Sequence, residues 1–150
     1  MRRQDRSISQ QEAIAVLQNA EYGVLSIASL DGEPYGVPLN YCVIDNAIYF
    51  HCAGEGKKLN ILSQNNSVSF CCIGATKVLP EQFALNYEST IISGKAEEVA
   101  GGEKQSSLEG MLKKYSSQFF SEGLEYIKAN TASARVYKIV IQSITGKARR

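Results

Sequence analysis

Hydrophobic and polar positions follow helical spacing at the start of the chain and strand spacing through most of its length. Ser9 and Glu12 form a capping box, and the apolar residues that follow, up to Ala20, lie on one face of a predicted helix. Short runs with strand character come next, separated by turns such as Asp31-Gly32. The predicted strands are residues 22–29, 35–44 with an interruption at Pro38, 47–52, 68–73, 87–99 with a bend at Gly94, and 134–144.

The remaining segments predict shorter helices and one long loop. A short helix follows the glycine-rich turn at residues 54–56, and two more helices are expected at residues 103–115 and 121–129. Residues 74–85 contain Pro80 and have no clear period. We therefore expect a loop there that reaches across the molecule.

Hairpin-linked strands with helices at the margins predict a mainly β fold with flanking helices, in which residues 1–150 form a single antiparallel barrel domain. Several strands are apolar on both faces. In the last one, Tyr137 and Ile139 share one face, whereas Val136 and Val140 share the other. The outer face of so small a barrel must then be covered by helices or by a second subunit, so we expect a homodimer.

Composition narrows the class of protein. With 150 residues, 44% of them hydrophobic, and a net charge of +1, the chain is typical of one soluble globular domain. Nucleic-acid-binding domains are usually strongly basic, and membrane spans need a long apolar run, so we expect neither partner. The charged start at Met1 lacks the apolar middle of a secretory signal, which favours a cytoplasmic location.

The four cysteines are expected to be reduced thiols. They are Cys42, Cys52, Cys71 and Cys72, and no Cys-x-x-Cys spacing occurs. Cys71 and Cys72 are adjacent in a predicted strand, so their side chains should point to opposite faces. With a single histidine in the chain, a metal site has little support, and we predict none.

The stretch at residues 49–62 carries the strongest chemical signal. It contains the only histidine, His51, and two glycines, followed by Lys57 and Lys58 in the first turn of the predicted helix. Lysines there oppose the helix dipole, and the placement makes sense if an anion such as a phosphate binds that turn. The alternative is an ordinary glycine turn followed by a solvated basic helix start.

Pro38 interrupts its predicted strand. Because proline has no amide proton, it fits an edge, a bulge or a strand end. A break there would free the backbone of Leu39, Asn40 and Tyr41 to face something other than a neighbouring strand. On spacing alone an ordinary edge strand is the simpler interpretation, and a ligand wall is the other.

The ordered set of motifs resembles the pyridoxamine 5′-phosphate oxidase-like flavoproteins, and within them the 5-nitroimidazole-resistance branch. The similarity covers nearly the whole chain, from about Arg2 to Lys147. The residues that carry it are Asp31-Gly32-x-Pro34-Tyr35-x-Val37-Pro38-Leu39, Ile48-Tyr49-Phe50-His51-Cys52-Ala53-x-x-Gly56-Lys57-Lys58-x-x-x-Leu62, Asn65-x-x-Val68-x-Phe70, Tyr87-x-Ser89-x-x-x-x-Gly94-Lys95-Ala96-Glu97 and Ile144-Thr145-Gly146-Lys147.

This resemblance implies a split β-barrel homodimer with FMN at the subunit interface. The phosphate would bind Lys57 and Lys58; many relatives carry arginine first, so bidentate phosphate contact is lost here. His51 would be the catalytic residue beside the flavin, and Ser89 would contribute from the partner side. The implied cofactor-binding set is Pro38, Leu39, Asn40, Tyr41, Phe50, His51, Lys57, Lys58 and Ser89. The alternatives without a site role are a satisfied core histidine at position 51 and a surface serine at position 89.

The resemblance implies an FMN-dependent oxidoreductase that passes electrons from a donor to a small acceptor, such as a nitroimidazole-type compound, with His51 supplying a proton. The first alternative is a flavin- or haem-binding carrier or sensor without turnover, in which His51 could ligate haem iron. The second is a barrel that only mediates protein contacts. Pyridoxamine phosphate oxidation itself is less well supported, because only Arg135 is a spare cation near an apolar strand.

Overall fold

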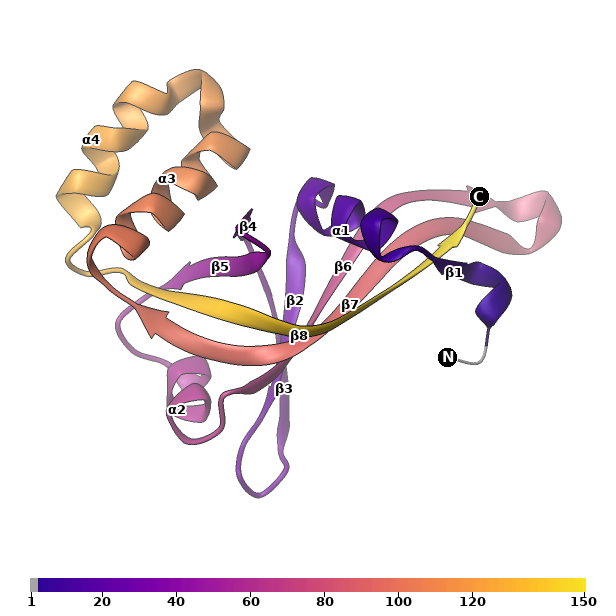
Figure 1. Cartoon of the computed structure of the whole chain (residues 1–150), viewed down its shortest axis with the longest axis horizontal. Coiled ribbons are helices and arrows are strands. Elements are labelled where there is room, and N and C mark those ends of the chain that lie inside the picture. The colour runs from indigo at the N-terminus through magenta and orange to yellow at the C-terminus, as the bar shows by residue number, and fades with distance from the viewer. Residues whose placement is uncertain (1–2) are drawn as a thin grey trace.

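A computed structural model describes residues 3–150, so Met1 and Arg2 of the charged start lie outside the described residues. One strongly curved antiparallel sheet forms the centre, with helices at its margins (Figure 1). The strands are β1 Ser7–Ile8, β2 Gly23–Ala28, β3 Pro34–Leu39, β4 Cys42–Ile44, β5 Ala47–Cys52, β6 Ser67–Leu79, β7 Ala84–Val99 and β8 Arg135–Arg149. The helices are α1 Gln10–Asn19, α2 Lys57–Gln64, α3 Gly101–Ser116 and α4 Phe120–Asn130, with 3-10 turns at Gln4–Arg6, Pro80–Gln82 and Ser117–Phe119.

The strand order makes this sheet a split barrel. Hydrogen-bonded neighbours run β3-β2-β6-β7-β8-β5-β4, and β1 pairs with β8. The two edge strands, β3 and β4, are joined by only Asn40 and Tyr41. The sheet therefore curls until its edges are connected by the chain without pairing with each other. The prediction of a mainly β split barrel with flanking helices is confirmed.

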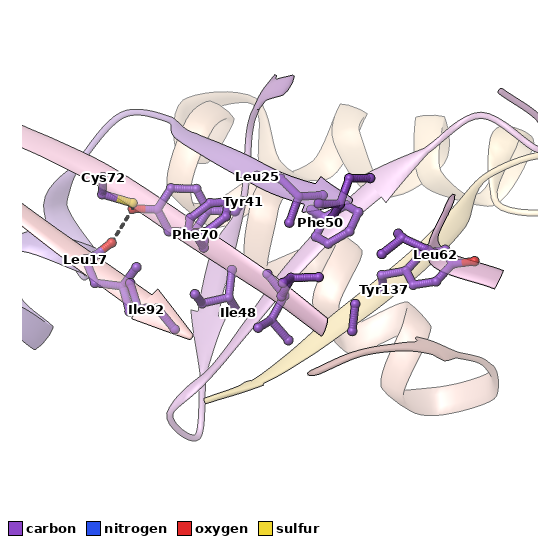
Figure 2. Close-up of a cluster of buried hydrophobic side chains, with 14 of the residues drawn as sticks. Leu17, Leu25, Tyr41, Ile48, Phe50, Leu62, Phe70, Cys72, Ile92 and Tyr137 are labelled. Carbon is purple, nitrogen blue, oxygen red and sulfur yellow. Dashed lines mark hydrogen bonds between the residues drawn. The ribbon is translucent and has the colours of Figure 1, made fainter. Parts of the chain in front are cut away.

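The main core fills the inside of this curve. Phe50 stacks on Tyr137 with ring centroids 5.7 Å apart, and Tyr41 meets Phe70 edge-on at 5.0 Å. Figure 2 shows these rings with aliphatic side chains from β2, β5, β7 and helices α1 and α2. The predicted capping box is confirmed, because the Ser9 hydroxyl accepts from the Glu12 amide and the Glu12 carboxylate accepts from the Ser9 amide.

A smaller apolar cluster lies on the outer face of the sheet, under α3. It contains Val136 of β8, whereas Tyr137 and Ile139 belong to the inner core, so the two predicted faces of the last strand are confirmed. A Cβ placed on Gly110 would lie 3.0 Å from Sγ of Cys42, which shows how closely α3 approaches β4. Helix α4 packs in turn on α3, and the pair stands above β5 and β8 (Figure 1).

The loop predicted at residues 74–85 is wrong. Strands β6 and β7 extend into residues 74–85 and form a hairpin that turns at Pro80–Gln82 and Phe83. We call the outer part of this hairpin, on both sides of that turn, the arm, and β8 runs beside it to Arg149 (Figure 1). The arm residues are largely exposed, so their sequence has no buried face to create a period. The predicted bend at Gly94 is confirmed as a register shift between Ser93 and Gly94.

Pro38 does not interrupt its strand. It pairs with Val24 inside β3, and the break comes two residues later at Asn40 and Tyr41. Because β3 is an edge strand, a residue without an amide proton costs no ladder bond there. The interpretation as an edge strand is therefore confirmed, and the position of the break is corrected.

The outer face of β3, β2, β6 and β7 is not covered by any helix of the described chain. Strand register places Pro38, Val24, Cys71 and Ile91 side by side across this face. Ile91 is 51% exposed, while Cys72, on the opposite face from Cys71, is fully buried, as predicted for the adjacent cysteines. Among the described residues, no helix has the length and apolar character needed to cross a bilayer.

Candidate functional site

The corner between β5 and α2 holds the predicted phosphate-binding residues. Gly56 caps α2 with φ +136°, a backbone conformation that favours glycine, and it has no side chain to satisfy the first amides of the helix. Nζ of Lys57 lies 2.8 Å from Oε1 of Glu33 in the β2–β3 turn. Nζ of Lys58 lies 5.4 Å from the ring centroid of Phe50. The anion-binding role of both lysines stays a prediction.

His51 lies on the outer side of β5, opposite the core residue Phe50. The histidine remains accessible to solvent, and its Nδ1 is 3.3 Å from Sδ of Met111 in α3. Partial burial against α3, followed by the positive charge of Lys58, lowers the pKa of His51 below its ordinary value. The imidazole is therefore mainly neutral at pH 7, rather than poised to be protonated as the sequence led us to expect.

The seam between β3 and β4 is held by a tyrosine of α3. The hydroxyl of Tyr115 accepts from the amide of Tyr41 at 3.1 Å and donates to the carbonyl of Glu21 at 2.7 Å. The backbone freed by the strand break is therefore engaged at Tyr41, although Asn40 remains exposed. The Tyr41 side chain points inward, where its hydroxyl donates to the carbonyl of Leu17.

A lysine beside this seam is unusual because its ammonium nitrogen is buried without a hydrogen bond. Nζ of Lys114 has no partner among the described residues, and it lies 3.7 Å above the ring centroid of Tyr41 and 5.3 Å from that of Tyr115. Burial lowers the pKa of Lys114. The ammonium is thus held by aromatic faces, an arrangement that strengthens where water is excluded.

A cavity of about 890 Å³ opens between the end of β5 and the α3–α4 pair. Its lining includes Asn40 and His51 together with Met111 and Ile127 from the two helices. The sequence pointed to the first two, but it gave no signal for the helical wall. A second cavity, of about 720 Å³, lies between α1 and the arm and contains none of the predicted site residues.

The predicted site residues do not all come together within this chain. Ser89 lies in the arm, paired with Ile73 and Lys147, while α2 with its lysines is at the opposite side of the molecule (Figure 1). Phe50 is fully buried, so its side chain belongs to the core in this chain. Cofactor binding by the predicted set, Pro38, Leu39, Asn40, Tyr41, Phe50, His51, Lys57, Lys58 and Ser89, stays a prediction.

All four cysteines are free thiols. Burial raises the pKa of Cys42 and of Cys72 to about 11, so both are protonated at neutral pH. Among residues 3–150, no three His, Cys, Asp or Glu side chains come together as a possible metal cluster.

Comparison with known proteins identifies relatives of the whole chain. A candidate 5-nitroimidazole antibiotic resistance protein from Bacteroides thetaiotaomicron is similar over 94% of this chain and 85% of its own, with 26% identity and a TM-score of 0.80. A FAD and heme binding protein from Mycobacterium smegmatis shares the fold over 97% of this chain and 73% of its own, with 14% identity and a TM-score of 0.82. A FAD-binding protein from Mesorhizobium loti does so over 97% and 98%, with 22% identity and a TM-score of 0.70.

No curated protein matches the chain. The family model described as pyridoxamine 5′-phosphate oxidase matches residues 9–148, which is nearly the complete sequence. The chain therefore belongs to the pyridoxamine 5′-phosphate oxidase family.

Proposed function

We propose that this protein is an FMN-dependent oxidoreductase that acts as a cytoplasmic homodimer and reduces a small acceptor, such as a nitroimidazole-type compound. Its membership of the family and its similarity to a candidate 5-nitroimidazole resistance protein support this function. The observation that carries the proposal is the open N-terminus of α2, where Lys57 and Lys58 adjoin amides that no side chain of the described residues caps.

This corner fits the phosphate of FMN. A doubly charged anion there would accept hydrogen bonds from the first amides of α2 and neutralise both ammonium groups. Apart from its chain neighbours, a Cβ built on Gly56 would meet no described atom within 4 Å, so there is open space beside this turn. Bound FMN would supply the electron transfer, and the protein would hold and shield the ring.

The uncovered outer face of the sheet supports the homodimer. Ile73, Val78, Leu85 and Ile91 in the arm hairpin of β6 and β7 are all at least 42% exposed. An exposed apolar surface of this kind is typical of a protein interface. Ser89 lies between Ile91 and Leu85 along β7, so a partner docked on this face would also cover Ser89.

His51 is the proposed catalytic residue. As a mainly neutral imidazole it can donate one proton in a hydrogen bond to the acceptor, and it has a second nitrogen to accept one. Its position in the lining of the 890 Å³ cavity allows a small molecule to approach it from solvent.

The proposal is tested by the pigment and by charge removal. Purified protein should be yellow and release a chromophore with the mass of FMN. A variant with Lys57→Ala and Lys58→Ala should bind FMN about tenfold more weakly or worse, since charge-assisted contacts to phosphate are among the strong ones. The matched control, Lys113→Ala with Lys128→Ala, removes two charges from α3 and α4 and should bind FMN normally. Equal affinity in the two double variants would refute the phosphate site.

A flavin- or haem-binding carrier is the second candidate. The observation that favours it is His51 itself, which is accessible beside a large cavity and has no hydrogen-bond partner for Nε2 among the described residues. His51→Ala separates the two functions. Loss of nitroimidazole reduction with intact FMN supports catalysis, whereas loss of a haem Soret band supports ligation.

A further inference from the structure

The cavity beside His51 has a wall that the proposed flavin site does not use. Its lining includes Leu108, Met111 and Leu112 of α3 together with Tyr126 and Ile127 of α4. Neither Lys57 nor Lys58 is among its lining residues. The cavity is therefore distinct from the predicted phosphate corner, and it lies on the outer side of β5.

The two helices are built to approach closely around this space. A Cβ on Gly123 of α4 would lie 2.2 Å from Cδ1 of Leu112, so glycine is needed for Leu112 to occupy its position in the wall. Near its C-terminal end, α3 is anchored by the hydrogen bonds of Tyr115 to the seam. The wall thus belongs to a fixed pair of helices rather than to a loop.

The lining discriminates by charge. Of the residues that the structure describes, no lysine or arginine lines the cavity, and Glu55 is the only carboxylate there. Glu55 is exposed, and His51 is mainly neutral. An anionic ligand would gain no ion pair and would meet Glu55, while an uncharged ligand would lose nothing by desolvation of a charge.

Polar groups line the cavity from two sides. The His51 ring and the exposed Asn40 amide come from the sheet, and Ser116, Asn130, Thr131 and Ser133 come from α3, α4 and the turn after α4. His51 and Asn40 can donate to a hydrogen-bond acceptor of a flat molecule that packs on the apolar side chains of the two helices. The volume of about 890 Å³ is near the upper end of the range for drug-sized ligands, so the cavity has room for fused rings larger than a single nitroimidazole ring.

We propose that this cavity binds an uncharged, flat, fused-ring aromatic compound, with its carbonyl or ring-nitrogen acceptor directed at His51 and Asn40. Naming this compound as the electron acceptor rests on the function proposed above. The binding itself requires neither flavin nor turnover, so the two proposals fail separately.

The chain has no tryptophan, so a single introduced tryptophan is a specific reporter. Tyr126→Trp places it in the cavity wall at a residue that is 70% exposed, and Phe83→Trp places the control at the tip of the arm, at a residue that is 99% exposed. The uncharged naphthalene ketone dye Prodan is the probe, and anilinonaphthalene sulfonate is its anionic counterpart. Energy transfer to Prodan should saturate in the Tyr126→Trp variant, with at least tenfold weaker binding of the sulfonate. The Phe83→Trp variant should show no saturation.

A third variant reverses the charge argument. Ser116→Lys adds a cation to the cavity lining at the C-terminal end of α3, where the helix dipole favours it. In the Tyr126→Trp background it should strengthen sulfonate binding at least tenfold relative to Prodan. Unsaturable transfer in the Tyr126→Trp variant, or equal affinities for the two dyes before and after Ser116→Lys, would overturn the site. Saturable Prodan binding by a protein that takes no FMN would uphold the site and end only its role in electron transfer.

Discussion

The hydroxyl of Tyr115 is the group whose removal tests most directly how the barrel seam is held. Tyr115→Phe keeps the ring and deletes one oxygen atom, which accepts from the Tyr41 amide at 3.1 Å and donates to the Glu21 carbonyl at 2.7 Å. The amide of Tyr41 would be left without its partner in a part-buried place. Leaving such a group unsatisfied costs about 1–3 kcal/mol, and Tyr115 is 38% exposed, so we expect about 1–2 kcal/mol.

For a chain of 150 residues, that loss corresponds to a fall in Tm of roughly 2–8 °C. Thermal unfolding followed by circular dichroism measures it, with Tyr126→Phe as the matched control. The hydroxyl of Tyr126 has no hydrogen bond within the described chain, and this side chain is 70% exposed, so its stability change should stay within about 0.5 kcal/mol. If the two variants melt together, α3 does not hold the seam through this oxygen.

Two further predictions concern the bulge and the histidine. Gly94→Ala places a Cβ 2.3 Å from the carbonyl oxygen of Val140, and urea titrations should show the free energy of unfolding lowered by about 1–3 kcal/mol. The control is Gly102→Ala in α3, where the added Cβ has open space, and the free energy of unfolding should stay unchanged or rise. His51 should titrate below about 6.5 by NMR. Because its folded pKa is the lower one, the unfolded chain binds more protons, and the free energy of unfolding should fall as pH falls through the unfolded value toward the folded one. His51→Gln should lose that part of the pH dependence; an identical profile would contradict the lowered pKa.

Local sequence predicts an element of the fold well when one face of that element is buried, because its apolar residues then repeat at the spacing of a helix or a strand. The division of β8 into two faces at Val136 and Tyr137 is of this kind, whereas the capping box was predictable because Ser9 and Glu12 bond within one helical turn. The arm was missed because its strands pair with each other while most of their side chains stay exposed, so that pairing leaves no mark on the pattern.

Sequence proximity limits what can be predicted of the candidate site. Lys57 and Lys58 follow Gly56 directly, and this placement alone left an anion site and a solvated helix start as alternatives. The bond from Tyr115 to Tyr41 joins residues 74 positions apart, and Lys114 would be taken for an ordinary solvated lysine of a helix. Such contacts arise when α3 packs over the seam, a step that no local period encodes.

A second subunit is the arrangement that would bring the separated residues to one cofactor. Ser89 lies on the uncovered face of the arm, and the lysines of α2 lie at the opposite side of the same chain (Figure 1). A flavin that touches both must therefore span two copies.

Ile91→Arg puts a charge at the centre of the uncovered face, at a side chain that is already 51% exposed, so the monomer should fold. Analytical ultracentrifugation should find it monomeric, and fluorescence titration should find FMN binding weakened although Lys57 and Lys58 are intact. Phe119→Arg, at a 62% exposed residue between α3 and α4, should stay dimeric and bind FMN. A monomeric Ile91→Arg protein that binds FMN as well as the wild type would place the whole flavin site within one chain.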